Sequence, residues 1–442
     1  VNSIEASPHE PGVAYVVAMK YKVGDNRPYV WRTVNYGRSW TSIAGGLPEE
    51  HFVRVVREDP EREGLLFAGM ERGLYVSFNS GQDWRPFQTN LPVVPITDLM
   101  LRRNDLVLAT QGRSFWVIDD IAPLRQYRQE DEQAVLQLYA PSPAVRLTPT
   151  NGRNSGGESS APSAPHGAII YYALAEDASL EEQGLKIEIL DNDGMVLRTL
   201  ETDEETGIEG GGSDTAYALP AERGINRAVW DLRTAPTTQL DYGVVFGAAG
   251  EDKAIPGYRV APGTYTVRLS YGDEILEHAV EVSWDPINTY DPARIAEQQA
   301  FLAETFGMID ALYKRIASLQ SIQRQVELRK SIADEAGDDA LLAAAETLLG
   351  ALDAWQKSVT TPERETFQDV LNFAPRIDAF LTNVYQQADS AVLGLTRGQR
   401  ERLDDLRPGW QSAIERWERL MDEDVAAFNG QAGPAVSVPD WN

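Results

Sequence analysis

Cysteine is absent from this 442-residue chain, which excludes disulfide bonds, thiol catalysis and thiolate metal sites. Long apolar runs are absent too, and no stretch approaches the ~18 consecutive apolar residues of a membrane-spanning helix. The four histidines, His9, His51, His166 and His278, share no metal-site spacing. No Gly-x-Ser-x-Gly, His-Glu-x-x-His or phosphate-loop motif occurs. We therefore expect no cofactor, no metal site and no membrane insertion.

Positive charge is scarce. The chain has 40 Lys and Arg against 67 Asp and Glu, a formal net charge of −27, which disfavours nucleic acid as a partner. The imbalance is uneven, because residues 1–127 carry 14 basic against 15 acidic residues and the remainder carries 26 against 52. We expect the acidic groups of the later part to face solvent rather than to form a metal cage.

The length of the chain exceeds that of one typical domain and predicts two to four domains. The first residues, Val1-Asn2-Ser3, include no initiator Met, and neither a basic segment nor an apolar leader follows. We expect either that a leader was removed or that the chain is part of a longer protein.

An internal repeat occupies the first part of the chain. The pattern Ser/Thr-x-Asn-x-Gly-x-x-Trp occurs twice, 44 residues apart, at Thr33, Asn35, Gly37 and Trp40 and at Ser77, Asn79, Gly81 and Trp84. The Asn side chain can close a tight turn on backbone amides, and the Gly supplies a positive φ. We expect both tryptophans to pack between neighbouring sheets and to be buried. A worn third copy, residues 112–120, places Asp120 at the Asn79 position but lacks the Gly and the Trp.

A period near 44 with several short strands is typical of β-propeller blades. Two clear copies and one degenerate copy cannot close a ring, since propellers need about four to eight blades. Left alone, such a piece would expose sheet edges and apolar faces. We therefore expect the remaining propeller blades to be supplied by a preceding segment of the same gene product or by another chain.

The repeat motif resembles the Asp box, a structural hairpin of BNR-repeat proteins such as sialidases, xyloglucanases and sortilin-type receptors. Four segments, Ser7–Tyr15, Phe52–Pro60, Leu91–Pro95 and Ala109–Asp120, resemble the last blades of large bacterial BNR/sortilin-N-terminal-like proteins, which carry a glycosyl hydrolase label. The similarity extends over the whole chain. It implies the C-terminal part of a secreted or periplasmic propeller protein of the bacterial cell envelope.

Catalytic residues are hard to assign, because glycoside hydrolysis needs two opposed carboxylates among 67 acids. Asp119 and Asp120, at the end of a predicted blade strand, are weak candidates, and a degenerate turn is the more frequent role for such residues. A sialidase would also need converging arginines. The sequence does not show whether its arginines, at Arg54, Arg57, Arg72 and Arg113 among others, converge.

The middle of the chain predicts strands. Residues 1–128 are assigned to propeller blades and 134–286 to an Ig/fibronectin-like β-sandwich with a flexible loop at 150–166. Asp191–Gly194 predicts a hairpin turn between two strands. An EF-hand is disfavoured there, because the twelfth loop position is Thr202 rather than Glu. The acidic run Asp203–Glu205 beside the glycines at 210–212 predicts a solvated loop, and Trp230 predicts a sandwich core residue.

The last part of the chain predicts a helical bundle at 287–432 and a C-terminal arm at 433–442. Asp291-Pro292 is an N-cap followed by a first-turn proline. Thr396 and Gln399 have the spacing of a capping box. Trp441 suggests that the arm docks on the domain.

Three functions remain open at this stage. The first is a non-catalytic part that braces the propeller ring and supports binding of a carbohydrate or peptide ligand or of a protein. The second is part of a carbohydrate-active hydrolase, sialidase- or xyloglucanase-like, whose carboxylates lie mainly in other blades. The third is a structural subunit of a larger assembly. Fold analogy does not choose among them, since propellers host binding and catalysis alike.

Overall fold

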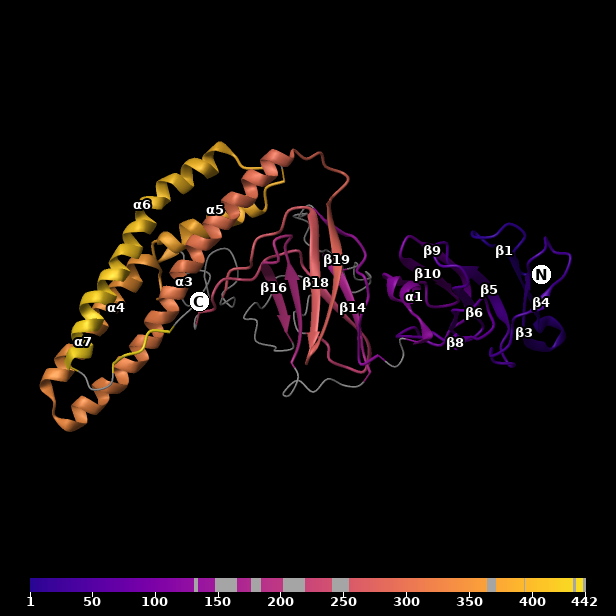
Figure 1. Ribbon diagram of the computed structural model, residues 1–442, viewed down its shortest axis with the longest axis horizontal. Coiled ribbons are helices and arrows are strands. Elements are labelled where there is room, and N and C mark those ends of the chain that lie inside the picture. The colour runs from indigo at the N-terminus through magenta and orange to yellow at the C-terminus, as the bar shows by residue number, and fades with distance from the viewer. Residues whose placement is uncertain are drawn as a thin grey trace. The chain divides into compact units, whose positions relative to one another are not determined.

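The computed structural model describes residues 1–130, 134–147, 165–175, 184–201, 219–240, 254–363, 371–392, 394–431 and 435–439. Residues 150–164 of the loop predicted at 150–166, the acidic run Asp203–Glu205 with its neighbouring glycines, and Trp441 lie outside the described residues. The chain forms β-sheets followed by a C-terminal helical region (Figure 1). It divides into two compact units, Val1–Ser142 and Pro143–Asn442. Among the described helices, none is both long and apolar enough to cross a bilayer.

The first unit contains three antiparallel sheets, named here the first, second and third sheets. Their strands are β1 (Ser3–Ala6), β2 (Ala14–Lys20), β3 (Asp25–Thr33) and β4 (Thr41–Ser42); β5 (Val53–Glu58), β6 (Leu66–Met70), β7 (Leu74–Ser77) and β8 (Arg85–Pro86); and β9 (Ile96–Arg102), β10 (Asp105–Thr110) and β11 (Phe115–Ile118). The unit also holds the short turn η1 (Tyr21–Val23), helix α1 (Ala122–Gln126) and strand β12 (Leu136–Leu138).

The 44-residue period reappears in the strand positions. Strand β3 ends at Thr33 and β7 ends at Ser77, and the two-residue strands β4 and β8 are offset by the same 44 residues. The first and second sheets are therefore copies of one four-stranded meander. Within the described residues the third sheet has three strands, in the order β11-β10-β9.

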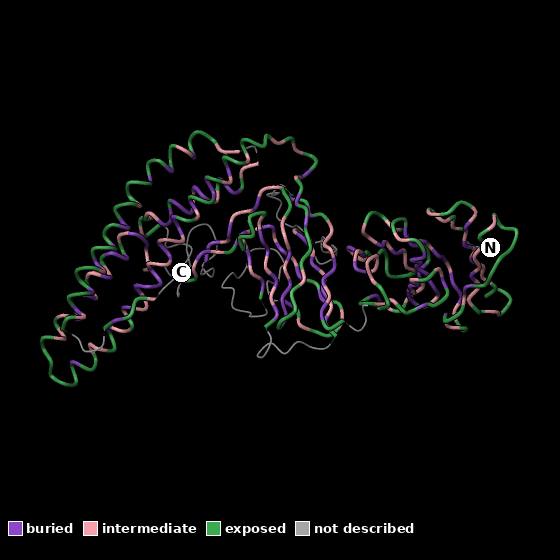
Figure 2. The backbone as a smooth tube through the Cα atoms, viewed as in Figure 1, coloured by how far each residue is buried: buried purple, intermediate pink, exposed green. Residues whose placement is uncertain are grey.

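Burial distinguishes the middle sheet from its neighbours (Figure 2). One apolar cluster joins the first and second sheets and includes Val17, Val30 and Met70. A second cluster joins the second and third sheets and includes Phe67 and Leu108. All five residues of β6 are buried, because the second sheet is covered on both faces. The other two sheets each have one covered face.

The second unit begins with two sheets. The larger has the order β13-β19-β18-β15-β16, with β13 parallel to β19 and the other pairs antiparallel. Strands β14 and β17 pair antiparallel in the other sheet. Their bounds are β13 (Ala144–Arg146), β14 (Ala168–Leu174), β15 (Leu185–Leu190), β16 (Val196–Glu201), β17 (Gly224–Trp230), β18 (Gly263–Tyr271) and β19 (Glu274–Trp284).

Trp230 is fully buried, as predicted. Its ring lies edge-on to Tyr265 of the larger sheet, at 5.3 Å between centroids, and its Nε1–H donates to the Arg233 carbonyl at 2.8 Å. The predicted hairpin is also present, since the Asp191 carboxylate accepts from the backbone N–H of Asp193 and Met195, both at 2.9 Å. That carboxylate is therefore used to close a turn.

The helical region consists of α3 (Pro292–Ala336), α4 (Asp339–Val359), α5 (Ile377–Asp389), α6 (Arg397–Arg419), the π-helical segment η4 (Leu420–Val425) and α7 (Ala426–Gln431). The predicted caps are confirmed. Asp291 accepts from the Ala293 N–H, and Thr396 and Gln399 form a reciprocal capping box. The terminal arm also contacts α3, where the Gln325 amide exchanges two hydrogen bonds with the Ser437 backbone at 2.9 and 3.0 Å.

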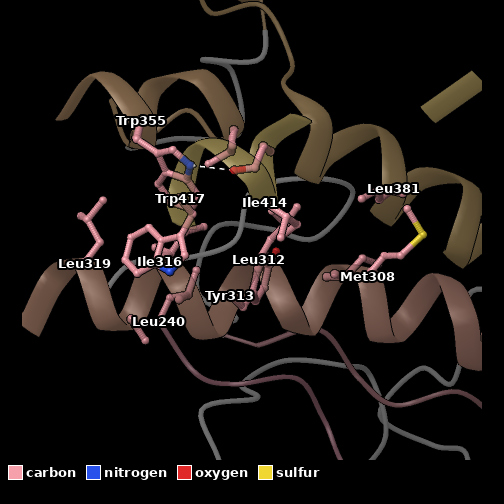
Figure 3. Packing of buried hydrophobic residues seen from close by; sticks show 14 of the residues in the cluster. Leu240, Met308, Leu312, Tyr313, Ile316, Leu319, Trp355, Leu381, Ile414 and Trp417 are labelled. Carbon is pink, nitrogen blue, oxygen red and sulfur yellow. Dashed lines mark hydrogen bonds between the residues drawn. The ribbon is translucent and has the colours of Figure 1, made fainter. Parts of the chain in front are cut away.

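The helices share one apolar core (Figure 3). Trp355 and Trp417 lie 4.8 Å apart between ring centroids, and the Trp355 Nε1–H donates to the Ala413 carbonyl at 3.0 Å. Leu240, from the segment that follows β17, belongs to the same cluster. The helical region is therefore packed against the chain that leaves the sheets.

The expectation that acidic groups face solvent is correct for Glu297 and Glu304, which form exposed ion pairs with Arg400 and Arg407 of α6. It is wrong for Asp285, Asp378 and Asp389, which are buried. Each of these three accepts a backbone N–H, which compensates in part for the loss of water.

Candidate functional site

The two repeat turns have the same hydrogen bonds. In the first, the Asn35 Oδ1 accepts from the Ser39 N–H at 2.9 Å, and the Thr33 hydroxyl accepts from the Gly37 N–H at 3.0 Å. In the second, Asn79 accepts from the Asp83 N–H at 3.0 Å, and Ser77 from the Gly81 N–H at 2.9 Å. Gly37 and Gly81 have φ of 83° and 85°, which only glycine adopts readily. The predicted side-chain to backbone bonds are present at both turns.

The two turn tryptophans differ, however. Trp84 is 6% exposed, and its Nε1–H donates at 2.8 Å to the carbonyl of Ile43, which follows the last strand of the first sheet. Trp40 is 43% exposed, so the expectation that it is buried is wrong for this chain. The reason is positional. Trp84 packs on the sheet before it, whereas the described residues hold no sheet before the first.

Asp119 and Asp120 directly follow β11, which ends at Ile118. Asp120 has φ of 54°, matching the residues after the repeat asparagines, Tyr36 at 58° and Ser80 at 59°. By backbone conformation Asp119 therefore occupies the Asn79 position, one residue earlier than the sequence alignment placed it. The Asp120 carboxylate accepts from the Ala122 N–H at 3.1 Å and the Ser142 hydroxyl at 3.0 Å. Burial raises the pKa of Asp120, against the effect of these bonds.

A polar cluster lies along the edge strands β1, β5 and β9, which are neighbours, and sequence reasoning missed it. Arg57 of β5 contacts Glu5 of β1 at 3.3 Å and Asp98 of β9 at 2.9 Å. Its guanidinium also donates to the Ser3 hydroxyl and the Leu99 carbonyl, both at 3.2 Å. We call Ser3, Glu5, Arg57 and Asp98 the inner-edge cluster. It joins one side chain or more from each of the three sheets.

Electrostatics at this cluster are mixed. Burial raises the pKa of Glu5, Arg57 acts in the opposite direction, and the nearby Glu58 and Asp98 carboxylates raise it further. Arg54 bonds the Glu71 carboxylate at 2.5 and 2.8 Å. Two of the four arginines considered for a sialidase therefore pair with acids of their own or adjacent sheets. Arginines inside the otherwise apolar first strand of the second sheet, as in Val53-Arg54-Val55-Val56-Arg57, are the signal that could have located the cluster.

A second cluster, in the second unit, gathers three arginines around one acid. Asp389, the last residue of α5, contacts Arg233 at 3.0 Å and Arg259 at 3.4 Å, and accepts the Arg259 N–H at 3.0 Å. Arg146 donates to the Val260 carbonyl at 2.8 Å and lies 4.6 Å from the Trp284 ring centroid. We call Arg146, Arg233, Arg259 and Asp389 the arginine cluster.

The pKa values of the arginine cluster reflect burial and mutual repulsion. Burial, with a contribution from Arg259, lowers the pKa of Arg146 to about 10. Burial acts to raise the pKa of Asp389, but Arg233 and Arg259 outweigh it and the net direction is downward. The cluster ties the end of α5 to segments flanking β17 and β18, so its chemistry is that of a structural ion pair. Among the described residues no group of three or more His, Asp or Glu could hold a metal ion.

No family model and no curated protein matches this chain. Among solved structures it is similar to the extracellular domain of BT4673 from B. thetaiotaomicron, with 11% identity and a TM-score of 0.20, over 62% of this chain and 30% of that one. It is also similar to a GH74 enzyme from Niastella koreensis, with 11% identity and a TM-score of 0.22, over 62% and 58% of the two chains. A third similarity is to YCF48 bound to D1 peptide, with 10% identity and a TM-score of 0.20, over 65% and 79%. Likenesses this distant assign neither a family nor an activity.

Proposed function

We propose that this chain is a non-catalytic part of a secreted or periplasmic β-propeller protein. Residues 1–128 are blades of the ring, with the repeat turns as Asp boxes. Residues 134–286 are an Ig-like sandwich and 287–432 a helical bundle that brace the ring and support binding of a carbohydrate or peptide ligand or of a protein. Further blades come from the same gene product or from another chain.

One observation supports this proposal most directly. The second sheet is covered on both faces, whereas the sheets on either side of it leave apolar side chains in solvent. Ile4 of the first sheet is 67% exposed, and Met100 and Phe115 of the third are 62% and 74% exposed. Large apolar side chains grouped on a sheet face are a feature of surfaces that bind other protein. The three sheets therefore have the burial pattern of an interior stretch of a longer array.

The test is to measure whether these faces behave as unfilled interfaces. We expect the chain to bind the dye ANS and to self-associate at raised concentration, and the double substitution of Ile4→Ser with Phe115→Ser to reduce both without lowering the unfolding midpoint. Leu328→Ser, at an exposed position of α3, is the matched control and should leave dye binding unchanged. If the double variant bound as much dye as the parent, the faces would not be interfaces and the proposal would fall.

A glycoside hydrolase is the second candidate, and the inner-edge cluster is the observation in its favour. Glu5, whose pKa is raised by burial, and Asp98 lie on either side of Arg57. Two carboxyl groups in different surroundings on either side of a site are the arrangement that glycosidases use. Against it, Arg57 bonds both carboxylates, which leaves them engaged in an ion-pair network.

Hydrolysis assays distinguish the two candidates. We expect the chain to release no product from chromogenic glycosides or xyloglucan oligosaccharides. Turnover that is lost in Asp98→Asn and in Glu5→Gln, but kept in Asp119→Asn, would favour the hydrolase over the bracing role.

A further inference from the structure

One contact between the first two sheets has the form of a knob in a socket. The knob is Ile43, which follows β4 and is buried. The socket is made by Gly81 and Trp84 of the second repeat turn. A methyl group on Gly81 would lie 2.7 Å from Ile43 Cδ1, so the isoleucine fills the space that the glycine leaves. The Trp84 Nε1–H bonds the Ile43 carbonyl, which adds a directional hydrogen bond to the apolar contact.

The first repeat turn contains the same socket without a knob. A methyl group on Gly37 would meet only the ring of Trp40, at 3.6 Å and beyond. Within the described residues the Trp40 Nε1–H has no hydrogen-bond partner. The sheet face beside it is apolar, because strand register aligns Ile4 with Val16 and Val16 with Trp31. Both the socket and the face therefore match the surfaces buried in the second sheet.

We propose that the Gly37–Trp40 socket binds one specific partner, a further four-stranded blade of the same repeat type. The residue after that blade's fourth strand inserts an aliphatic side chain over Gly37, and its carbonyl accepts the Trp40 Nε1–H. This inference rests on the proposed function, and it adds the chemistry of the partner. The partner is a β-sheet that ends in a knob like Ile43, rather than a helix, a lipid surface or a sugar.

A second copy of this chain fits the socket less well. The sheet that a second copy could offer to the socket is its third, which lies at the other end of the three sheets. Within the described residues this third sheet lacks a fourth strand and hence a knob. Phe87, the counterpart of Ile43 after β8, is already packed inward, 6.4 Å from the Phe67 ring centroid. The knob has to come from a blade that retains its fourth strand, as the first two sheets do.

The experiment supplies such a blade from the chain's own sequence. A copy of residues 3–50 is fused directly before Val1, which leaves ten residues between the copied β4 and β1, as between β4 and β5 in the parent. Tryptophans are labelled with ¹⁵N at the indole, and the exchange of each Nε1–H with solvent is measured by NMR. In the parent we expect slow exchange at Trp84 and fast exchange at Trp40.

In the extended chain we expect exchange at the original Trp40 to slow by at least about tenfold, as a buried hydrogen bond forms, and the copied Trp40 to exchange fast. Ile43→Ala in the copied segment, the matched control, should restore part of the fast exchange. Slow exchange at Trp84 shows that the parent sheets remain folded; if it is lost, the measurement is repeated with a copy of residues 53–94 that carries Phe87→Ile. Fast exchange at the original Trp40 in every folded extension overturns the inference. If exchange at the original Trp40 stays fast, the methyl signals of Ile4 and Val16 show whether failure of the inference also means failure of the proposed function. The proposed function survives if these methyl groups become protected from solvent, and it falls together with the inference if they stay exposed.

Discussion

The stability contributed by a repeat tryptophan depends on the sheet that precedes it. Trp84 is buried against Ile43 and hydrogen-bonded to it, whereas Trp40 has solvent on one side. Truncating Trp84 creates a cavity and leaves the Ile43 carbonyl without its partner, while truncating Trp40 removes a half-exposed ring. The same residue type in the same turn thus has different energetic roles.

We expect Trp84→Ala to lower the free energy of unfolding of the first unit by roughly 3–5 kcal/mol. Trp40→Ala should lower it by about 1 kcal/mol or less, as for other exposed positions. Urea unfolding monitored by amide exchange in β5–β7 measures both. Equal losses for the two variants would contradict the assigned environments.

Asp389 is a buried acid of the second unit, and its ionisation affects folding through two arginines. Arg233 and Arg259 lower its folded pKa below the ordinary value, even though burial opposes them. Its stabilisation is therefore fully present above the unfolded pKa of about 3.9 and is lost as the pH falls through the lower folded value.

We expect Asp389→Asn to cost roughly 3–5 kcal/mol near neutral pH, because it leaves buried guanidinium groups without a counter-charge. The difference from the parent should shrink as the pH falls below about 4. Urea titrations of both proteins from pH 3 to 7 measure this. A difference that stays constant across the range would show that Asp389 acts through shape and not through charge. Glu401→Gln, on an exposed α6 ion pair, is the control and should change little.

At the scale of elements, local chemistry determines where segments begin and end. The Asp291 cap, the Thr396–Gln399 box and the Asp191 turn each involve residues at most four positions apart, and all three were predictable from the sequence. The inner-edge and arginine clusters were not. Arg57 and Asp98 are 41 positions apart, and Arg259 and Asp389 are 130 apart, so nothing local marks them as partners.

The burial of Trp40 was mispredicted for a similar reason. A repeat motif reports the turn that its own residues form, and it does so correctly at Asn35 and Asn79. Whether the tryptophan is covered depends on the neighbouring sheet, which lies outside the motif. Repeat patterns therefore predict the conformation within one repeat better than the packing between neighbouring repeats.

The capping box provides a test at this scale. Thr396→Ala should lower the free energy of unfolding of the helical region by about 1 kcal/mol, since it removes the bond that satisfies the Gln399 N–H. Thr396→Ser keeps the hydroxyl and should cost a few tenths of that. Circular dichroism at 222 nm during urea unfolding measures both variants, and similar losses for Ala and Ser would exclude capping as the cause.

At the scale of the whole molecule, charge is distributed unequally between a nearly neutral front and an acidic remainder. The like charges of this acidic remainder repel one another at low ionic strength. Sodium chloride at about 0.15 M shortens the screening length to about 8 Å and should raise the unfolding midpoint of the second unit.

Calcium separates screening from specific binding. We expect calcium chloride at the same ionic strength as sodium chloride to give the same midpoint in differential scanning calorimetry. A rise at micromolar calcium, beyond the shift from matched sodium chloride, would mean that the acidic excess includes a metal site. The chelator EDTA, added to the protein as purified, provides the control and should leave the midpoint unchanged.

The double coverage of the second sheet also bears on the order of unfolding. In a linear array of sheets that contact only their nearest neighbours, an interior sheet opens only when its interfaces with both neighbours break, whereas a terminal sheet loses one interface. The three sheets of the first unit then behave as a short chain with fraying ends. The amides of β6 should be the slowest to exchange in this unit, and those of β2 and β10 faster. A further sheet added beyond the first would become the fraying end, and the first sheet would become an interior sheet.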